Sequence, residues 1–463
     1  MRQCSMAMCL LFMTLAGVQH KATAQKKYEL TVKEAVDLAF KNVTDVKNAA
    51  LDVDIQRAQN KEITGRALPQ LTGNASISRY LELPQILFPD GSGAGIYNVL
   101  INEGLLPQST KVPTPALRPV SFFQPWNASA SANLSQLLFQ PDVFVGLLAR
   151  KTAINYSQAN LEVVKEKIKD SAYRRYYAIL IAQKQSQFLQ GGIERLRKLY
   201  HDDSIMYVNG FAERLDLDKV QVQLTNLQTS QIVLHNSINL AYAALKYSIG
   251  VSQSDTVELK ETLSNEELKE NILDENFTYE DRKEFKLLDY ARQLQMLDVR
   301  RYKLGYLPTL STALSYTAQG QGQKFITDNN TFWLRNSLVS LNLSVPLFDG
   351  FQRRYKVQQA QLNLQKVNNT VDNLKQVIDL QKTITKESLT NALLNLDAQE
   401  RNVKLAETVY NTTKKKFESG LGSSFEVLQA DNDWQTAQSN YFNGLYNAVV
   451  ARIGFLSALG KLQ

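Results

Sequence analysis

Two acidic residues occupy matching positions in two similar stretches of the chain. Asp216 lies six residues after Gly210, and Glu426 lies six residues after Gly420. Each falls near the expected start of a helix, where a carboxylate is favoured by the positive end of the helix dipole. The spacing therefore leaves two uses open: ordinary helix-start residues, or carboxylates that set the charge of a site.

Residues suited to bond-making chemistry are scarce. After the N-terminal stretch the chain contains no cysteine and only two histidines, His201 and His235. This leaves few soft ligands for a metal, and the sequence shows no glycine-rich phosphate loop and no nucleophile elbow. The remaining carboxylates have spacings typical of solvated helix faces. We expect no enzymatic activity, no cofactor and no metal site.

The composition is that of an ordinary folded chain. Of 463 residues, 44% are hydrophobic and 21% are charged, and the formal net charge is +7. Basic residues do not cluster with interleaved aromatic residues, so we expect no nucleic-acid partner. No apolar run beyond the N-terminal stretch reaches the length of a membrane-spanning helix. Insertion into a membrane would therefore require a β-barrel.

The N-terminal stretch has the features of an export signal. A basic residue precedes an apolar run from about Met6 to Val18, and a small-x-small site ends at Ala24. The alternative is a first transmembrane helix, for which the run is shorter than the roughly 20 residues required. We expect residues 1–24 to be a cleaved signal peptide.

The remaining chain is internally duplicated. The stretch that begins at Tyr200 aligns without a gap with the stretch that begins at Tyr410, and the same offset carries Gly250 onto Gly460. A repeat of this kind indicates two copies of one structural unit. The expected divisions are a first repeat at 25–250, a linker or equatorial segment at 251–277, a second repeat at 278–463, and a long loop at 82–124 inserted in the first repeat.

Long helices follow from the absence of proline and from the apolar spacing. Residues 143–208 and 350–417 contain no proline, so each can form one helix of about 100 Å at 1.5 Å per residue. Apolar residues alternate steps of three and four, which is typical of coiled-coil packing. Shorter helical stretches are expected at 33–66 and 214–248. Periodicity alone also allows an ordinary bundle of long helices.

Four segments have the alternation or composition of strands. The helical period changes at Pro308, where proline disfavours continuation of a helix. A soluble sandwich would show the same alternation. Four strands cannot close a membrane barrel, for which about eight is the smallest common number. We therefore expect several copies of the chain to share one barrel, to which a trimer would supply twelve strands. The segments are 70–81, 126–138, 309–319 and 332–347.

Three motifs in this order carry a family resemblance. They are "GYLPTLS" from Gly305, "PLFDG" from Pro346 and "FESGLGSSFEVLQAD" from Phe417. Together with the duplication, they resemble the TolC family of outer-membrane efflux proteins from Leu30 to Gly460. The resemblance implies a membrane α+β fold: a homotrimer with a 12-stranded outer-membrane barrel and a long periplasmic α-helical coiled-coil barrel.

The resemblance also implies partners and a function. The expected partners are a periplasmic adaptor (membrane fusion) protein, an inner-membrane pump of the RND, ABC or MFS type, and outer-membrane lipid. The trimer would export small molecules or proteins without chemistry of its own. Two other functions stay open: a structural periplasmic coiled-coil protein and a passive outer-membrane porin.

The family places its functional residues at the turns between the long helices. By resemblance, the turn residues contact the adaptor, although they could serve the turn alone. The expected contact residues are Gly210, Phe211, Gly420 and Leu421. Acidic rings just beyond the turns would narrow the tunnel and favour cations. The expected pore constriction consists of Asp216, Glu426, Gln429, Phe417 and Tyr207.

The sequence departs from the best-studied closed gate of this family. A tyrosine three residues before the second glycine and an arginine two residues after it are replaced by Phe417 and Gly422. Neither replacement carries a side-chain hydrogen-bond donor. We therefore predict that hydrophobic packing around Phe417 and Tyr207, rather than a salt bridge, holds the tunnel closed.

Overall fold

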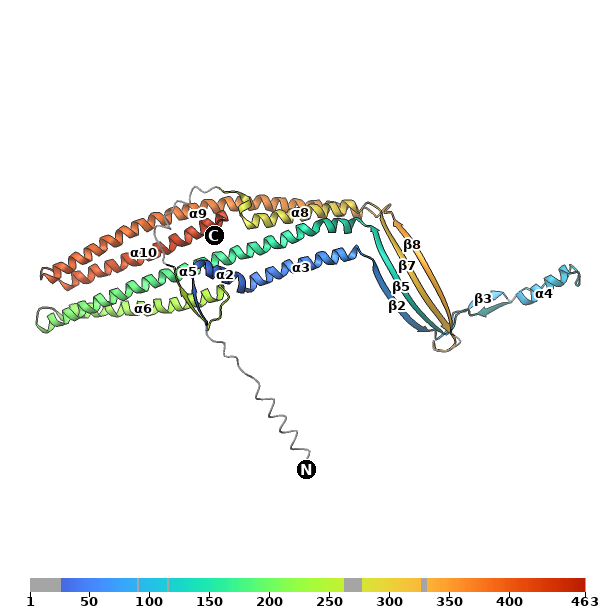
Figure 1. Cartoon of the computed structure of the whole chain (residues 1–463), viewed down its shortest axis with the longest axis horizontal. Coiled ribbons are helices and arrows are strands. Elements are labelled where there is room, and N and C mark those ends of the chain that lie inside the picture. The colour runs from blue at the N-terminus through green and yellow to red at the C-terminus, as the bar shows by residue number, and fades with distance from the viewer. Residues whose placement is uncertain (1–25, 90, 115, 262–276, 326–330, 463) are drawn as a thin grey trace, which may run out of the picture. The chain divides into compact units, whose positions relative to one another are not determined.

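The computed structural model describes residues 26–462 except 90, 115, 262–276 and 326–330 (Figure 1). The expected signal peptide at 1–24 and most of the expected linker at 251–277 lie outside the described residues. The chain divides into two compact units. The helical unit comprises Met1–Gln56, Thr152–Gln293 and Gln365–Gln463, and the sheet unit comprises Arg57–Lys151 and Leu294–Leu364.

The sheet unit contains one four-stranded antiparallel sheet with the order β2-β5-β7-β8. Its strands fall in the four segments expected from the sequence, with small differences at their ends. They are β2 (Gln70–Arg79), β5 (Trp126–Phe139), β7 (Thr309–Gly322) and β8 (Phe332–Ser344). The end strands, β2 and β8, each pair with one neighbour in the described chain.

The register gives this sheet one apolar and one polar face. Residues directly opposite each other point to the same face, and successive residues alternate. One cross-strand row, on the apolar face, consists of Leu71, Leu134, Leu314 and Val339. A row on the opposite face consists of Asn74, Ser131, Thr317 and Asn336. All four side chains of the apolar row are exposed in the single chain.

The change from helix to strand lies where proline predicts it. Helix α8 (Lys283–Leu304) follows the short helix η1 (Tyr279–Asp281), and it ends shortly before Pro308. The Gly305 N–H still donates to the Arg301 carbonyl over 3.1 Å. Pro308 then directly precedes β7.

The insertion at 82–124 is not wholly a loop. It contains β3 (Ile86–Pro89) and β4 (Leu117–Val120), which pair antiparallel, and α4 (Gly91–Asn102). Phe88 of β3 contacts Phe122 with ring centroids 5.8 Å apart. The expectation of a loop rested on the proline and glycine content, which does not preclude short paired strands.

Two very long helices and two shorter ones form most of the helical unit, as the sequence predicts. The long helices, α5 (Pro141–Val208) and α9 (Gln352–Glu418), have 68 and 67 residues and also extend into the sheet unit. The shorter ones are α6 (Arg214–Ser248) and α10 (Ser424–Leu459).

Helix α5 continues through two adjacent glycines, Gly191 and Gly192. Glycine is costly inside a helix, but here it permits close packing. A Cβ atom on Gly192 would lie 3.0 Å from Leu227 Cδ2 of α6 and 3.6 Å from Gln435 Nε2 of α10. Gly192 therefore allows α6 and α10 to approach the backbone of α5.

The expected helical stretch at 33–66 is interrupted. It forms α2 (Val32–Asn42) and α3 (Thr44–Arg66), which are separated at Val43, where the backbone is extended. Gly250, at the end of α6, packs against this break, because a Cβ on Gly250 would lie 2.6 Å from Asn42 Cβ. Gly250 has φ +68°, a conformation that glycine adopts readily.

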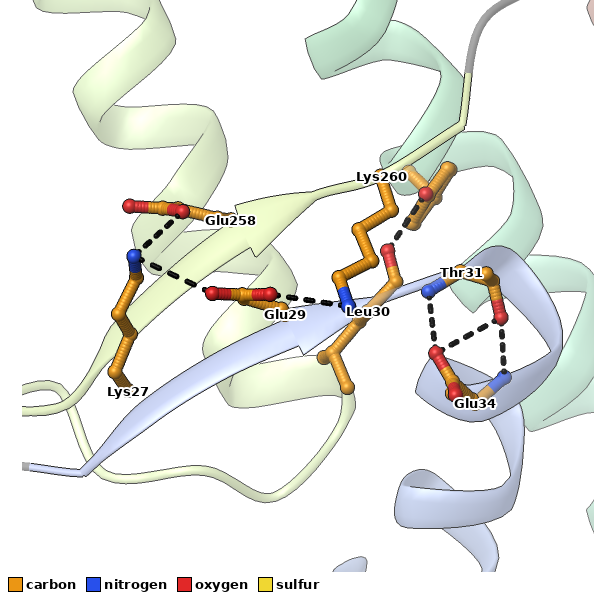
Figure 2. Close-up of polar contacts among 8 residues, drawn as sticks. Lys27, Glu29, Leu30, Thr31, Glu34, Glu258 and Lys260 are labelled. Carbon is orange, nitrogen blue, oxygen red and sulfur yellow. Dashed lines mark hydrogen bonds and ion pairs between the residues drawn. The ribbon is translucent and has the colours of Figure 1, made fainter.

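A small parallel sheet anchors the N-terminal part of the described chain. β1 (Lys27–Leu30) pairs with β6 (Thr256–Leu259), and two ion pairs connect their polar side chains: Lys27–Glu258 at 2.9 Å and Glu29–Lys260 at 3.0 Å (Figure 2). The buried Tyr176 hydroxyl donates to the Leu30 carbonyl over 2.8 Å. Burial raises the pKa of Tyr176 to about 12, so the hydroxyl keeps its proton as a donor.

Among the described residues, no helix combines the length and apolar content needed to cross a membrane.

Candidate functional site

The first helix-to-helix turn is closed by its backbone. Gly210 has φ +78°, and its N–H donates to the Tyr207 carbonyl over 3.0 Å. The Phe211 N–H donates to the Met206 carbonyl over 2.8 Å. These two bonds form a Schellman motif, which ends a helix at a left-handed residue. The side chain of Phe211 is 81% exposed in the single chain.

The second turn repeats this geometry. Gly420 has φ +73°, and its N–H donates to the Phe417 carbonyl over 2.9 Å. The Leu421 N–H donates to the Lys416 carbonyl over 3.0 Å. The Leu421 side chain is 77% exposed. Both glycines are therefore left-handed, and each turn presents an exposed apolar side chain.

The helices that follow the two turns start differently. Ser423 caps α10, because its hydroxyl accepts the Glu426 N–H over 3.3 Å. Glu213 occupies the equivalent cap position of α6 and makes no side-chain capping bond. The amino acids explain this, since serine is among the preferred N-cap residues.

Both candidate constriction carboxylates have a lysine partner. Asp216 lies 3.1 Å from the Lys219 ammonium on the same helix. Glu426 lies 2.9 Å from the Lys416 ammonium on the other side of the turn. The third polar candidate, Gln429, donates to Asp433 over 3.0 Å. Sequence reasoning did not predict these lysine partners, which reduce the net charge at each carboxylate.

The two aromatic candidates have different environments. Phe417 packs against a buried cluster formed by α5, α6, α9 and α10 that includes Leu199, Leu224 and Val427. Tyr207 remains 39% exposed. At Gly422, an added Cβ would lie 3.3 Å from a Glu426 carboxylate oxygen and 3.4 Å from Lys416 Cγ. The absence of a side chain there leaves room for the Lys416–Glu426 pair.

A buried ion pair near the turns was missed by sequence reasoning. Arg195 Nε of α5 lies 2.7 Å from Asp431 Oδ1 of α10, and Asp431 is 1% exposed. The Gln435 side-chain amide donates to the other Asp431 oxygen. The duplication could have revealed this pair, because Arg195 corresponds to Leu405 in the other repeat and Asp431 corresponds to Gln221. A charged pair that replaces a leucine and a glutamine in otherwise similar helices indicates a specific role.

A second buried carboxylate also lies near the turns. Asp203 of α5 is 1% exposed, and neither of its oxygens has a well-formed hydrogen bond among the described residues. Burial raises the pKa of this carboxyl, the Ser424 hydroxyl of α10 partly offsets that effect, and the nearby Asp216 and Asp202 raise the pKa further. Asp203 is therefore a buried carboxyl whose pKa lies above the ordinary value.

The part of the chain that the structure describes contains a cleft in the helical unit but no cluster of metal ligands. No group of three or more histidine, cysteine or acidic residues there could hold a metal ion. A cleft of about 560 Å³ lies among α5, α6 and α10, and its lining contains amide, hydroxyl and apolar side chains but no charged one.

The described chain thus contains a sheet with two chemically distinct faces and long paired helices that end in tight turns. Comparison with known proteins shows what this chain is similar to. Residues 297–461 match the family described as "Outer membrane efflux protein". "Outer membrane protein TolC" of Vibrio cholerae is 20% identical over 348 residues, covering 72% of this chain and 77% of the relative.

Two further proteins extend this similarity. "Alkaline protease secretion protein AprF" of Pseudomonas aeruginosa is 20% identical over 281 residues, covering 60% of this chain and 58% of AprF. The crystal structure of CusC superposes with a TM-score of 0.72 at 15% identity, covering 93% of this chain and 92% of CusC. Together these matches show that the chain is similar to outer-membrane efflux proteins of the TolC family and shares the fold of CusC.

Proposed function

We propose that three copies of the chain assemble into a channel that serves as the outer-membrane component of a tripartite efflux or secretion complex. The family match supports an outer-membrane efflux or secretion channel. The proposal of a trimer is supported mainly by the four-stranded sheet. Its edge strands, β2 and β8, each pair with one neighbour in the described chain, and its two faces differ in polarity.

Strand direction favours closure among copies. Each neighbouring pair in β2-β5-β7-β8 is antiparallel, so β2 and β8 run in opposite directions. The β8 edge of one copy can therefore pair antiparallel with the β2 edge of the next. Three copies would give 12 strands and leave no open edge, which a sheet in lipid requires.

The two faces fit a barrel with lipid outside and water inside. The apolar row at Leu71 would face lipid, and the amide and hydroxyl row at Asn74 would line the interior. Aromatic residues gather at one end of the sheet, which is opposite to the strand ends that are connected to helices. There Trp126 contacts Phe325 at 5.0 Å, and Trp333 covers Gly320. Aromatic side chains favour membrane–water interfaces.

The helix turns would form the periplasmic end and receive the adaptor. Phe211 and Leu421 support this role because they are large, apolar and exposed beside rigid turns. Gly210 and Gly420 would contribute by fixing those turns. The pump could be of the RND, ABC or MFS type, and the cargo small molecules or proteins.

The constriction would be formed by Asp216, Glu426 and Gln429 from each copy, with Phe417 as an apolar closing residue. Tyr207, which is exposed in the single chain, would contribute to closure only through contacts with another copy. If Phe417→Ala left the single-channel conductance unchanged, the hydrophobic closure would be wrong.

A cysteine cross-linking experiment tests the shared barrel. The mature chain would lack cysteine, so single cysteines on β2 and β8 would be the only thiols. Ser76→Cys together with Ser340→Cys should give cross-linked dimers and trimers in outer membranes, and no larger species. The matched control carries Ser129→Cys and Ala313→Cys on the inner strands, where no partner copy is expected. Equal cross-linking in the control, or ladders beyond a trimer, would contradict the proposal.

A further inference from the structure

The α5/α6 hairpin and the α9/α10 hairpin are joined by one buried charged contact. Arg195 lies on α5, in the first repeat, and Asp431 lies on α10, in the second. The pair is 2.7 Å apart, and the carboxylate is shielded from water. Removal of either partner should be destabilising, because it leaves the other charge buried without compensation.

Aromatic rings hold the guanidinium in this position. Its central carbon lies 4.2 Å from the centre of the Trp434 ring and 5.5 Å from the centres of the Phe188 and Tyr410 rings. Trp434 and Tyr410 stack on each other at 5.2 Å. Arg195 Nη2 is buried with no hydrogen-bond partner among the described residues, so its interactions are with the rings. Arginine suits such a site because its planar group both stacks and forms ion pairs.

The rings bring a third helix into the contact. Phe188 belongs to α5, Tyr410 to α9 and Trp434 to α10. The Arg195 guanidinium therefore reaches from the first hairpin onto both helices of the second. Separation of the two hairpins would have to withdraw the guanidinium from the rings and expose Asp431 to water.

We propose that the Arg195–Asp431 pair, together with the buried apolar cluster around it, holds the two hairpins together near the turns and thereby sets the width of the tunnel end. This inference rests on the proposed channel function. Other contacts link the hairpins closer to the turns, since Ser424 of α10 interacts with Asp203 of α5 and the Lys219 ammonium lies 4.7 Å from the centre of the Phe425 ring. The Arg195–Asp431 contact differs from these because it is an ion pair with a buried carboxylate. Arg195 and Asp431 are positioning residues, and they need not contact the cargo.

Single-channel recording of the purified full chain in a planar bilayer tests this inference. Arg195→Gln and Asp431→Asn should each raise conductance several-fold. The double variant should raise it no further than either single variant, because all three lose the same contact. Arg195→Lys keeps the charge but loses the planar stacking, and its conductance should lie between the wild type and Arg195→Gln.

The exposed pair Arg214–Asp218 on α6 provides the matched control, since its atoms lie 3.7 Å apart on the surface. Arg214→Gln and Asp218→Asn should leave conductance unchanged. Circular dichroism and native mass establish that each variant folds and assembles. If the neutral variants fail to assemble, the conductance of the charge-retaining Arg195→Lys is the test: a value above that of the wild type supports the inference, and an equal value contradicts it.

The outcomes separate the two proposals. A wild-type protein that does not conduct would contradict the proposed function itself. A conducting wild type whose assembled Arg195 and Asp431 variants conduct equally would overturn this inference alone.

Discussion

Asp203 is the residue whose protonation should affect stability most directly. In the folded chain its pKa is raised by burial, by Asp216 on α6 and by Asp202 on α5, against the effect of Ser424 on α10. In the unfolded chain it should titrate near the ordinary value of about 3.9. Between these two values the folded state binds a proton that the unfolded state has released.

Stability should therefore fall as pH rises through that interval, and the penalty should be complete above the raised pKa. Asp203→Asn removes the ionisable group, so it should stabilise the chain at neutral pH and flatten this dependence. Chemical denaturation of the wild type and the variant at several pH values from the ordinary aspartate range to neutrality measures the effect. An unchanged pH slope in the variant would contradict the assignment.

The lysine partners of the acidic residues predict ion selectivity. Lys416 neutralises Glu426 at 2.9 Å, so Lys416→Met should increase cation preference, and Glu426→Gln should decrease it. The reversal potential in a salt gradient reports this preference. Lys415→Met removes the neighbouring charge without breaking the pair, and it should have a smaller effect. An equal effect would show that only the total charge matters.

At the scale of elements, the two hairpins differ in how their second helices start. Ser423→Ala removes the cap of α10 and should destabilise the protein by about 1 kcal/mol. Glu213→Ser should introduce a cap on α6 and stabilise it by a similar amount or less. Denaturant unfolding measures both changes. A lower free energy of unfolding in Ser423→Ala together with a higher one in Glu213→Ser supports the role of the N-cap residue. A loss of stability in Glu213→Ser would contradict it.

Most elements could be predicted from local sequence patterns. Proline-free coiled-coil spacing predicted α5 and α9, and Pro308 predicted the start of β7 within a few residues. The break at Val43 could not be predicted, because it depends on the contact with Gly250, more than 200 residues away in sequence. The β3–β4 pair was missed because its strands are only four residues long.

The candidate site was predicted only in part, for a similar reason. The conformations of Gly210 and Gly420 follow from residue type and local position. The Lys416–Glu426 and Arg195–Asp431 pairs require knowledge of which helices are neighbours and which faces meet. The sequence shows that Arg195 and Asp431 replace a leucine and a glutamine of the other repeat. Their pairing and their packing against Trp434 follow only from the structure.

At the scale of the whole molecule, the account depends on the sheet. Under the proposed function, its two faces and opposed edge strands would make one chain a third of a barrel, and the helix turns would form the site for partners. A structural coiled coil would have no use for an exposed apolar sheet face.

The most direct test combines native mass with single-channel recording of the mature protein extracted from outer membrane in mild detergent. The account predicts a trimer with a small, cation-preferring conductance. A monomer or dimer without conductance would contradict the shared barrel and the export function that depends on it.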